Sequence, residues 1–135
     1  MGMYSDFYLK VRLVKPLPEV VKRALREMEV GFRAPSITGI DHPFFQTQRW
    51  NMVWRGSYVG EEFDEAPDES SFKNGTLTIT SAIKNYENEY QKFMDWLSPY
   101  VAEQNGAVVG KYQYEEDDEP TSIIFRDGKL RLENK

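Results

Sequence analysis

Apolar and polar residues alternate along several segments of this chain, which is typical of β-strands buried on one face. In the first such segment, Phe7 and Leu9 would lie on one face, with Tyr8 and Lys10 on the other. The alternation predicts strands over residues 3–14, 44–58, 76–83 and 107–114. The dipeptide Asn74-Gly75, just before the third segment, indicates a tight turn.

Two other kinds of signal complete the set of predicted elements. Residues 18–30 and residues 85–98 carry apolar side chains at three- and four-residue spacing, which predicts two amphipathic helices. Asn85 is a suitable cap for the second helix, and Pro99 should end it. Near the C-terminus, Asp127-Gly128 separates two short apolar runs and predicts a hairpin.

The order of these elements predicts one α+β domain over residues 1–135. Strand, helix, strand, strand, helix, strand matches the ferredoxin-like βαββαβ plan, an antiparallel sheet with both helices on one face, followed here by a C-terminal β-hairpin. A different α+β sandwich with five or six strands is the alternative. In the ferredoxin-like plan, acids 61–69 and acids 115–119 lie at opposite ends of the sheet. His42 and Asn85 should lie at the end that carries 115–119.

Composition supports a folded protein and excludes several kinds of chemistry. The chain has 135 residues, 40% of them hydrophobic, which is enough for a core. The absence of cysteine excludes disulfides, thiol catalysis and zinc–thiolate sites. No apolar run is long enough to span a membrane, and the first residues do not resemble a signal peptide. We therefore expect a cytoplasmic protein without membrane contact.

Charge is segregated along the chain, which has a net charge of −5. Eleven of the 22 acidic residues lie in two segments that contain no base. They are Glu61, Glu62, Asp64, Glu65, Asp68 and Glu69 in the first segment, and Glu115, Glu116, Asp117, Asp118 and Glu119 in the second. Acidic surfaces can attract basic partners. The leading hypothesis is a non-enzymatic interaction protein that binds a protein partner through these acidic loops.

The alternative hypothesis places nucleic acid on the sheet face that the helices leave open. If Phe7 and Leu9 face the helices, an aromatic and several basic side chains face outward, as in other nucleic-acid-binding sheets. These candidates are Tyr8, Lys10, Arg12, Arg49 and Arg55.

No motif in the sequence supports catalysis, a metal or a cofactor. The acids 115–119 are consecutive, so alternate side chains point apart, and no glycine provides the sharp turn of a calcium loop. His42 is the only histidine, and its neighbour Asp41 is poorly placed to orient it as a general base. The segment Gly106–Lys111 has three residues between its glycines where a phosphate-binding loop needs four. We expect no enzyme activity.

Aromatic residues at strand and helix spacing could line a ligand pocket, but they more often form a core. The sequence favours the core for Trp50, Trp54, Tyr86, Tyr90 and Phe93.

Two segments in the C-terminal third carry a resemblance. Residues 84–101 (KNYENEYQKFMDWLSPYV) and residues 110–125 (GKYQYEEDDEPTSIIF) resemble small uncharacterised proteins of phages and mobile elements. The resemblance includes no catalytic motif and implies an accessory role in a bacterial or phage setting. By analogy with small acidic phage proteins, it extends to inhibition of a host defence system.

Overall fold

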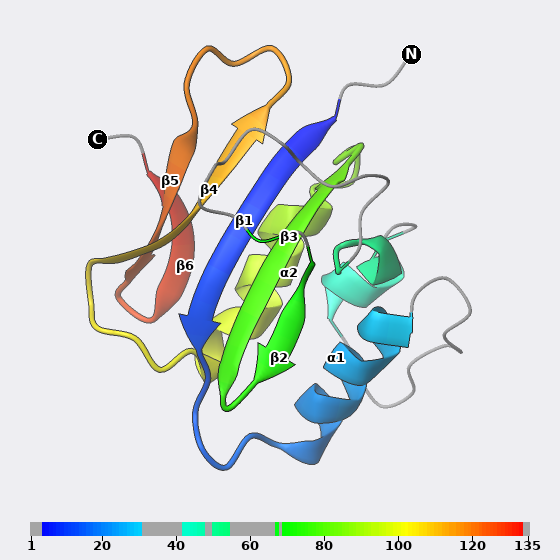
Figure 1. Ribbon diagram of the computed structural model, residues 1–135, viewed down its shortest axis with the longest axis vertical. Coiled ribbons are helices and arrows are strands. Elements are labelled where there is room, and N and C mark those ends of the chain that lie inside the picture. The colour runs from blue at the N-terminus through cyan, green and yellow to red at the C-terminus, as the bar shows by residue number, and fades with distance from the viewer. Residues whose placement is uncertain (1–3, 31–41, 48–49, 55–66, 68, 134–135) are drawn as a thin grey trace.

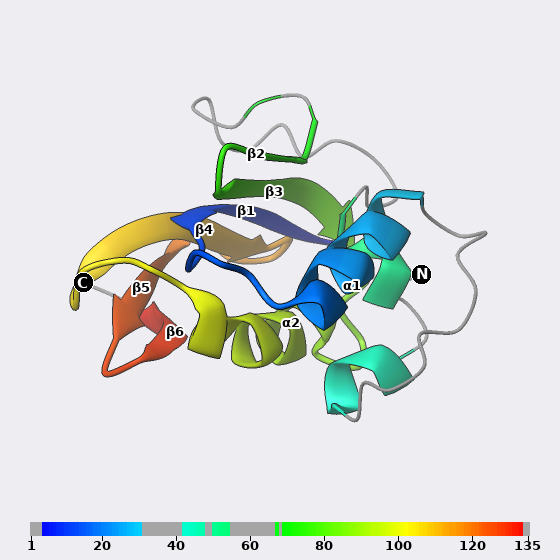
Figure 2. The same ribbon diagram turned by 90° about the horizontal axis from the view of Figure 1, so that it is seen from below.

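The structure, a computed structural model, describes residues 4–30, 42–47, 50–54, 67 and 69–133. Within these residues the strands are β1 (Ser5–Arg12), β2 (Ser71–Lys73), β3 (Thr76–Ile83), β4 (Ala107–Tyr114), β5 (Thr121–Arg126) and β6 (Lys129–Glu133). The helices are α1 (Glu19–Val30), α2 (Glu89–Leu97) and the short 3-10 helices η1 (Pro43–Gln46), η2 (Trp50–Met52) and η3 (Ser98–Tyr100). Both α-helices lie on one face of a single twisted sheet (Figures 1 and 2).

All neighbouring strands in the described sheet are antiparallel, in the order β2-β3-β1-β4-β5-β6. The predicted α+β class with an antiparallel sheet and two helices is confirmed. The strand order differs from the predicted plan because β5 pairs with β4 and β6 pairs with β5. The C-terminal hairpin therefore widens the sheet instead of forming a separate unit. Its turn is as predicted, with φ angles of 54° at Asp127 and 78° at Gly128.

The strand predicted over residues 44–58 is wrong for the part that the structure describes. Residues Pro43–Gln46 and Trp50–Met52 form 3-10 helices instead. His42 caps the first of these helices, because its ring Nδ1 accepts a hydrogen bond from the Phe44 backbone N–H at 3.1 Å. Proline at the next position suits the start of a helix because it has no N–H to satisfy.

The apolar residues of η1 and η2 pack on the α-helices, which explains the misleading pattern: η1 lies against α2 and η2 lies against α1. The ring of Phe44 lies 5.4 Å from that of Phe93, and the ring of Phe45 lies 5.0 Å from that of Trp96. Alternating apolar positions were therefore buried against a helix and not in a sheet. The edge strand is β2, which the Asn74-Gly75 turn joins to β3.

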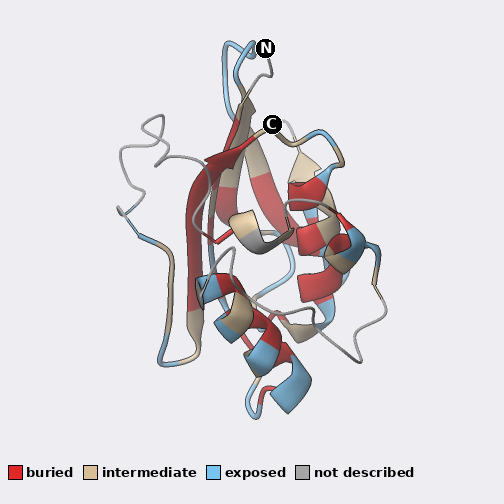
Figure 3. Cartoon of the chain, turned by 90° about the vertical axis from the view of Figure 1, so that its right-hand side faces the viewer, coloured by how far each residue is buried: buried red, intermediate tan, exposed pale blue. Residues whose placement is uncertain are grey.

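One hydrophobic core fills the space between the sheet and the helices (Figure 3). The ring of Tyr90 on α2 stacks on Phe7 of β1, with 4.3 Å between the centroids. Trp54, Tyr90 and Phe93 are buried as predicted, and Trp50 packs against the core. Tyr86 is 61% exposed, so its predicted place in the core is wrong. The reason is that α2 begins at Glu89, which leaves Tyr86 in the preceding turn.

Candidate functional site

The acidic tip, residues 115–119, closes the β4–β5 hairpin at one end of the sheet, and all five of its residues are exposed. The Asp117 N–H donates to the Tyr114 carbonyl at 2.9 Å, and the Gln113 side chain donates to the Asp117 carbonyl at 2.9 Å. Tyr4 and Glu115 exchange two hydrogen bonds, one through each backbone N–H, at 3.0 and 3.2 Å. These contacts give the tip a defined conformation and attach it to the start of β1.

Tyrosine side chains lie at the same end of the sheet. Ser5 pairs with Ile83 on one side and with Tyr114 on the other, so the turn after β3 lies level with the acidic tip. Partial burial raises the pKa of Tyr114, and the nearby carboxylates of Glu116 and Glu115 raise this pKa further. Tyr86 lies in the turn three residues after the end of β3, at this same end of the sheet. The end therefore combines carboxylates with exposed aromatic surface.

Asn85 also lies at this end, as predicted, and helps to organise it. Its side-chain oxygen accepts a hydrogen bond from the Tyr90 N–H in the first turn of α2, at 3.0 Å. Its side-chain nitrogen donates to Gln91 at 2.7 Å and to the Tyr112 hydroxyl at 3.3 Å. One amide therefore connects the start of α2 to β4.

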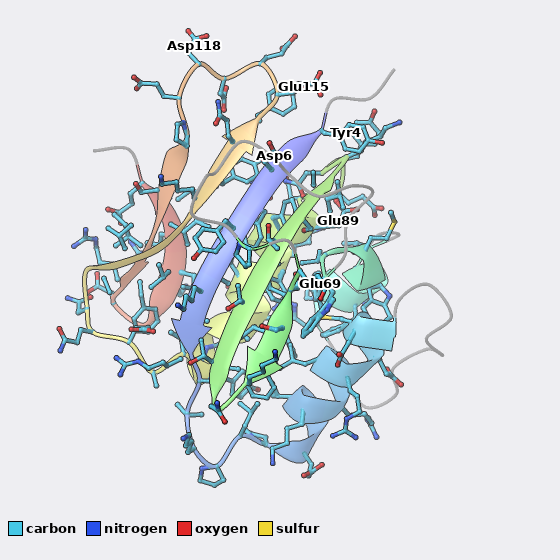
Figure 4. All side chains as sticks on the ribbon, in the orientation of Figure 1. Tyr4, Asp6, Glu69, Glu89, Glu115 and Asp118 are labelled. Carbon is cyan, nitrogen blue, oxygen red and sulfur yellow. The ribbon has the colours of Figure 1, made fainter. Side chains whose placement is uncertain are left out.

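The first acidic segment is mostly outside the described residues. Glu61, Glu62, Asp64, Glu65 and Asp68 fall there, and only Glu69 is described. Glu69 is exposed beside β2, well away from Glu115 and Asp118 (Figure 4). Among the described residues, Glu69 is therefore separate from the acidic tip.

His42 has both ring nitrogens engaged, which argues against a role as a general base. Its Nδ1 accepts from the Phe44 N–H, and its Nε2 lies 3.0 Å from Asp95 on α2. These contacts hold His42 against the helix layer and not beside the acidic tip, so its predicted position is wrong. The prediction assumed that a strand follows His42 and fixes it at one end of the sheet. Residues 43–46 form a 3-10 helix instead, so His42 is not held at that end.

The candidates on β1 lie on the face of the sheet away from the helices. Tyr8, Lys10 and Arg12 alternate with the buried Phe7, Leu9 and Val11 of β1 as predicted. Arg12 is bound by Glu103, with 3.4 Å between the charged groups. Arg49 and Arg55 lie outside the described residues.

Sequence reasoning missed the basic residues that β4, β5 and β6 add to this face. Their two-residue alternation was visible in the chain, but it could not show that these strands continue the same sheet. Tyr8 pairs with Lys111, which in turn pairs with Ser122 of β5. Further along β5, Ile124 and Arg126 lie on the same face as Ser122. Ile124 pairs with Arg131 of β6, and Arg126 pairs with Lys129.

Two absences hold within the part of the chain that the structure describes. No group of three or more histidine, aspartate or glutamate side chains there could hold a metal ion. No helix there is both long and apolar enough to cross a membrane.

Comparison of the chain with protein families, with curated proteins and with solved structures found no match. Function must therefore be inferred from the surfaces themselves.

Proposed function

We propose that this chain is a non-enzymatic interaction module that binds a basic surface of a protein partner through the acidic tip. The observation that supports this function is the joint presentation, at one end of the sheet, of five exposed acidic residues and the exposed ring of Tyr86. The hydrogen bonds of Tyr4 and Gln113 hold the tip in shape before any partner arrives. A preformed surface loses less conformational entropy on binding.

The two kinds of side chain would contribute differently to binding. Clustered carboxylates accelerate encounter with a basic surface and favour one orientation, but each exposed ion pair adds little affinity. Exposed tyrosines bury large area and often supply most of the binding energy of an interface. Tyr86 and Tyr114 would therefore form the centre of the contact, with Glu116, Asp118 and Glu119 around it.

Two segments of the sequence suggest what kind of partner the acidic tip would bind. The resemblance of residues 84–101 and 110–125 to small proteins of phages and mobile elements supports an accessory or inhibitory role toward a host protein. The acids at 61–69 would offer a second contact of the same charge. The pairing of β2, β3, β1 and β4 supports a ferredoxin-like core to which β5 and β6 have been added.

Affinity capture followed by rebinding of the purified partner tests the proposal. The test variant combines Glu116→Gln, Asp118→Asn and Glu119→Gln, and it leaves the structural contact of Glu115 intact. Loss of three exposed ion pairs, each worth about 0.2–1 kcal/mol, should weaken binding by about threefold to a hundredfold. The Tyr86→Ser variant should weaken it by at least about fivefold.

A matched control changes the same charge elsewhere. The combination Glu19→Gln, Glu27→Gln and Glu29→Gln alters three acids of α1 and should leave partner binding unchanged. Equal affinity of the tip variant and the wild type for the purified partner would contradict the proposal. Equal weakening by the α1 variant would show that net charge matters and that the tip does not.

A further inference from the structure

The face of the sheet away from the helices carries a strongly biased set of charges. Strand register assigns side chains to this face, because Tyr8 pairs with Lys111 and the alternation continues through each neighbouring strand. Among the described residues of these strands, the basic side chains on this face are Lys10, Arg12, Lys73, Lys111, Arg126, Lys129 and Arg131, and the acidic ones are Asp6 and Glu133. Figure 1 views this face, with α2 behind the sheet.

Some of these bases bind acidic residues nearby, and others are exposed. Arg126 donates two hydrogen bonds to Glu133, at 2.9 and 3.1 Å, and Arg12 binds Glu103. Lys10, Lys129 and Arg131 are exposed, and none of them forms an ion pair with another described residue. The result is a positive surface on a protein of net charge −5.

A hollow of about 260 Å³ lies in the middle of this positive surface. Its walls come from neighbouring strands: Tyr8 and Lys10 of β1, and Val108, Val109, Gly110 and Lys111 of β4. The pairing of β4 with β5 shifts register between Val108 and Gly110. Val108 is 51% exposed. An aromatic ring and an apolar side chain thus line a hollow with an ammonium group from each strand.

The accessible part of the face is the part that contains the hollow. Thr78, Thr80 and Ala82 of β3 point to the same face but are buried, with at most 8% of their surface exposed. Contact with a large ligand would therefore fall on β1, β4, β5 and β6.

We propose that this surface binds single-stranded nucleic acid, with one base in the hollow beside Tyr8 and adjacent phosphates at Lys10 and Lys111. The charge set fits a polyanion, and the ring and apolar wall fit the flat face of a base. A base inside a duplex cannot reach such a hollow, whereas an unstacked base of a single strand can. This site is separate from the acidic tip and does not depend on the function proposed for it.

Fluorescence anisotropy with labelled single strands of about 15 nucleotides, poly(dT) and poly(U), tests the proposal, with a duplex of equal length as comparison. We expect saturable binding of the single strands with a dissociation constant of about 1–100 µM at physiological salt. The duplex should bind more weakly. The difference between poly(dT) and poly(U) will show which nucleic acid the site prefers.

Three variants separate the contribution of the lysine charges to binding from that of stacking on Tyr8. Lys10→Gln with Lys111→Gln should flatten the slope of log K against log salt by about 1.4, since each phosphate contact on a single strand contributes about 0.7. Tyr8→Thr should weaken binding at least about fivefold and leave that slope unchanged, because it removes stacking and no charge. The matched control, Lys22→Gln with Lys92→Gln, removes two lysines from the helix layer and should change neither quantity.

Several outcomes would overturn the proposal. These are the absence of saturable single-strand binding at about 50 mM salt, equal weakening by the control pair, or unchanged affinity of the Tyr8 variant. If a variant does not fold, amide chemical shifts of the wild-type protein decide the matter. Addition of poly(dT) should shift the amides of Gly110 and Lys111 more than those of α1, and a uniform or absent response contradicts the site.

Discussion

Replacement of Gly110 by alanine should destabilise the protein through a clash in the centre of the sheet. Gly110 pairs with Leu9 of β1 on one side and with Ile123 of β5 on the other. A Cβ atom at this position would overlap the carbonyl oxygen of Tyr8 and lie 3.0 Å from the Cα atom of Leu9. These are backbone atoms of a strand held by β3 on its far side, so they cannot rotate away as a flexible side chain would.

The magnitude follows from this geometry. Overpacking of a well-packed interior costs typically about 1–3 kcal/mol, and rigid backbone neighbours place this variant near the upper figure. Alanine also has less conformational freedom than glycine in the unfolded chain, and this offsets about 0.4–1 kcal/mol of the cost of the clash. The net loss should therefore be about 2 kcal/mol or more, a large part of a total stability of about 5–15 kcal/mol.

Urea unfolding followed by tryptophan fluorescence and by far-ultraviolet circular dichroism measures this loss. With a denaturant slope of about 2 kcal/mol per molar, the midpoint should fall by about 1 M. Gly128→Asn is the matched control, because a Cβ atom at Gly128 meets nothing within 4 Å and asparagine tolerates the left-handed backbone there. Because the left-handed backbone still strains asparagine slightly, this variant should lose about 1 kcal/mol or less, clearly less than Gly110→Ala. A Gly110→Ala midpoint equal to that of the wild type would refute the reasoning.

Two further predictions concern single contacts. The N-cap residue of α2 is Asn88 and not the predicted Asn85, but the Asn85 side chain still accepts from the Tyr90 N–H in the first turn. Asn85→Ala should therefore cost about 1 kcal/mol and lower the melting temperature by roughly 4 °C, because this N–H loses its acceptor; an unchanged melting temperature would contradict this role. The hydrogen bonds from Arg126 lower the pKa of Glu133, so this pair stabilises the fold above the ordinary glutamate pKa and loses that effect as pH falls through the lowered value. In Arg126→Gln, carboxyl titration by NMR should show the pKa of Glu133 moving back toward its ordinary value, and an unmoved pKa would contradict this assignment.

The candidate surfaces were only partly accessible from the sequence. The exposed acids at 115–119 and the outward positions of Tyr8, Lys10 and Arg12 followed from turn signals and alternation within single segments. Lys111 and Arg131 were not found, because their place on the same sheet face as Lys10 depends on which strands are neighbours. The aromatic alternation around Trp50 predicted a strand, although Trp50 lies in a 3-10 helix that packs on α1, and its ring contacts that of Phe45.

The sequence by itself determined the elements whose signals are local. Alternation defined β1 and β3, helical spacing defined α1 and α2, and the turns at Asn74-Gly75 and Asp127-Gly128 needed only a few neighbouring residues. The tertiary structure decided how these elements pair, that β5 and β6 extend the sheet, and that Tyr86 stays exposed. The physical reason is that strand pairing and burial depend on contacts between residues far apart in the chain, whereas periodicity reports only the preference of each segment for having one buried face.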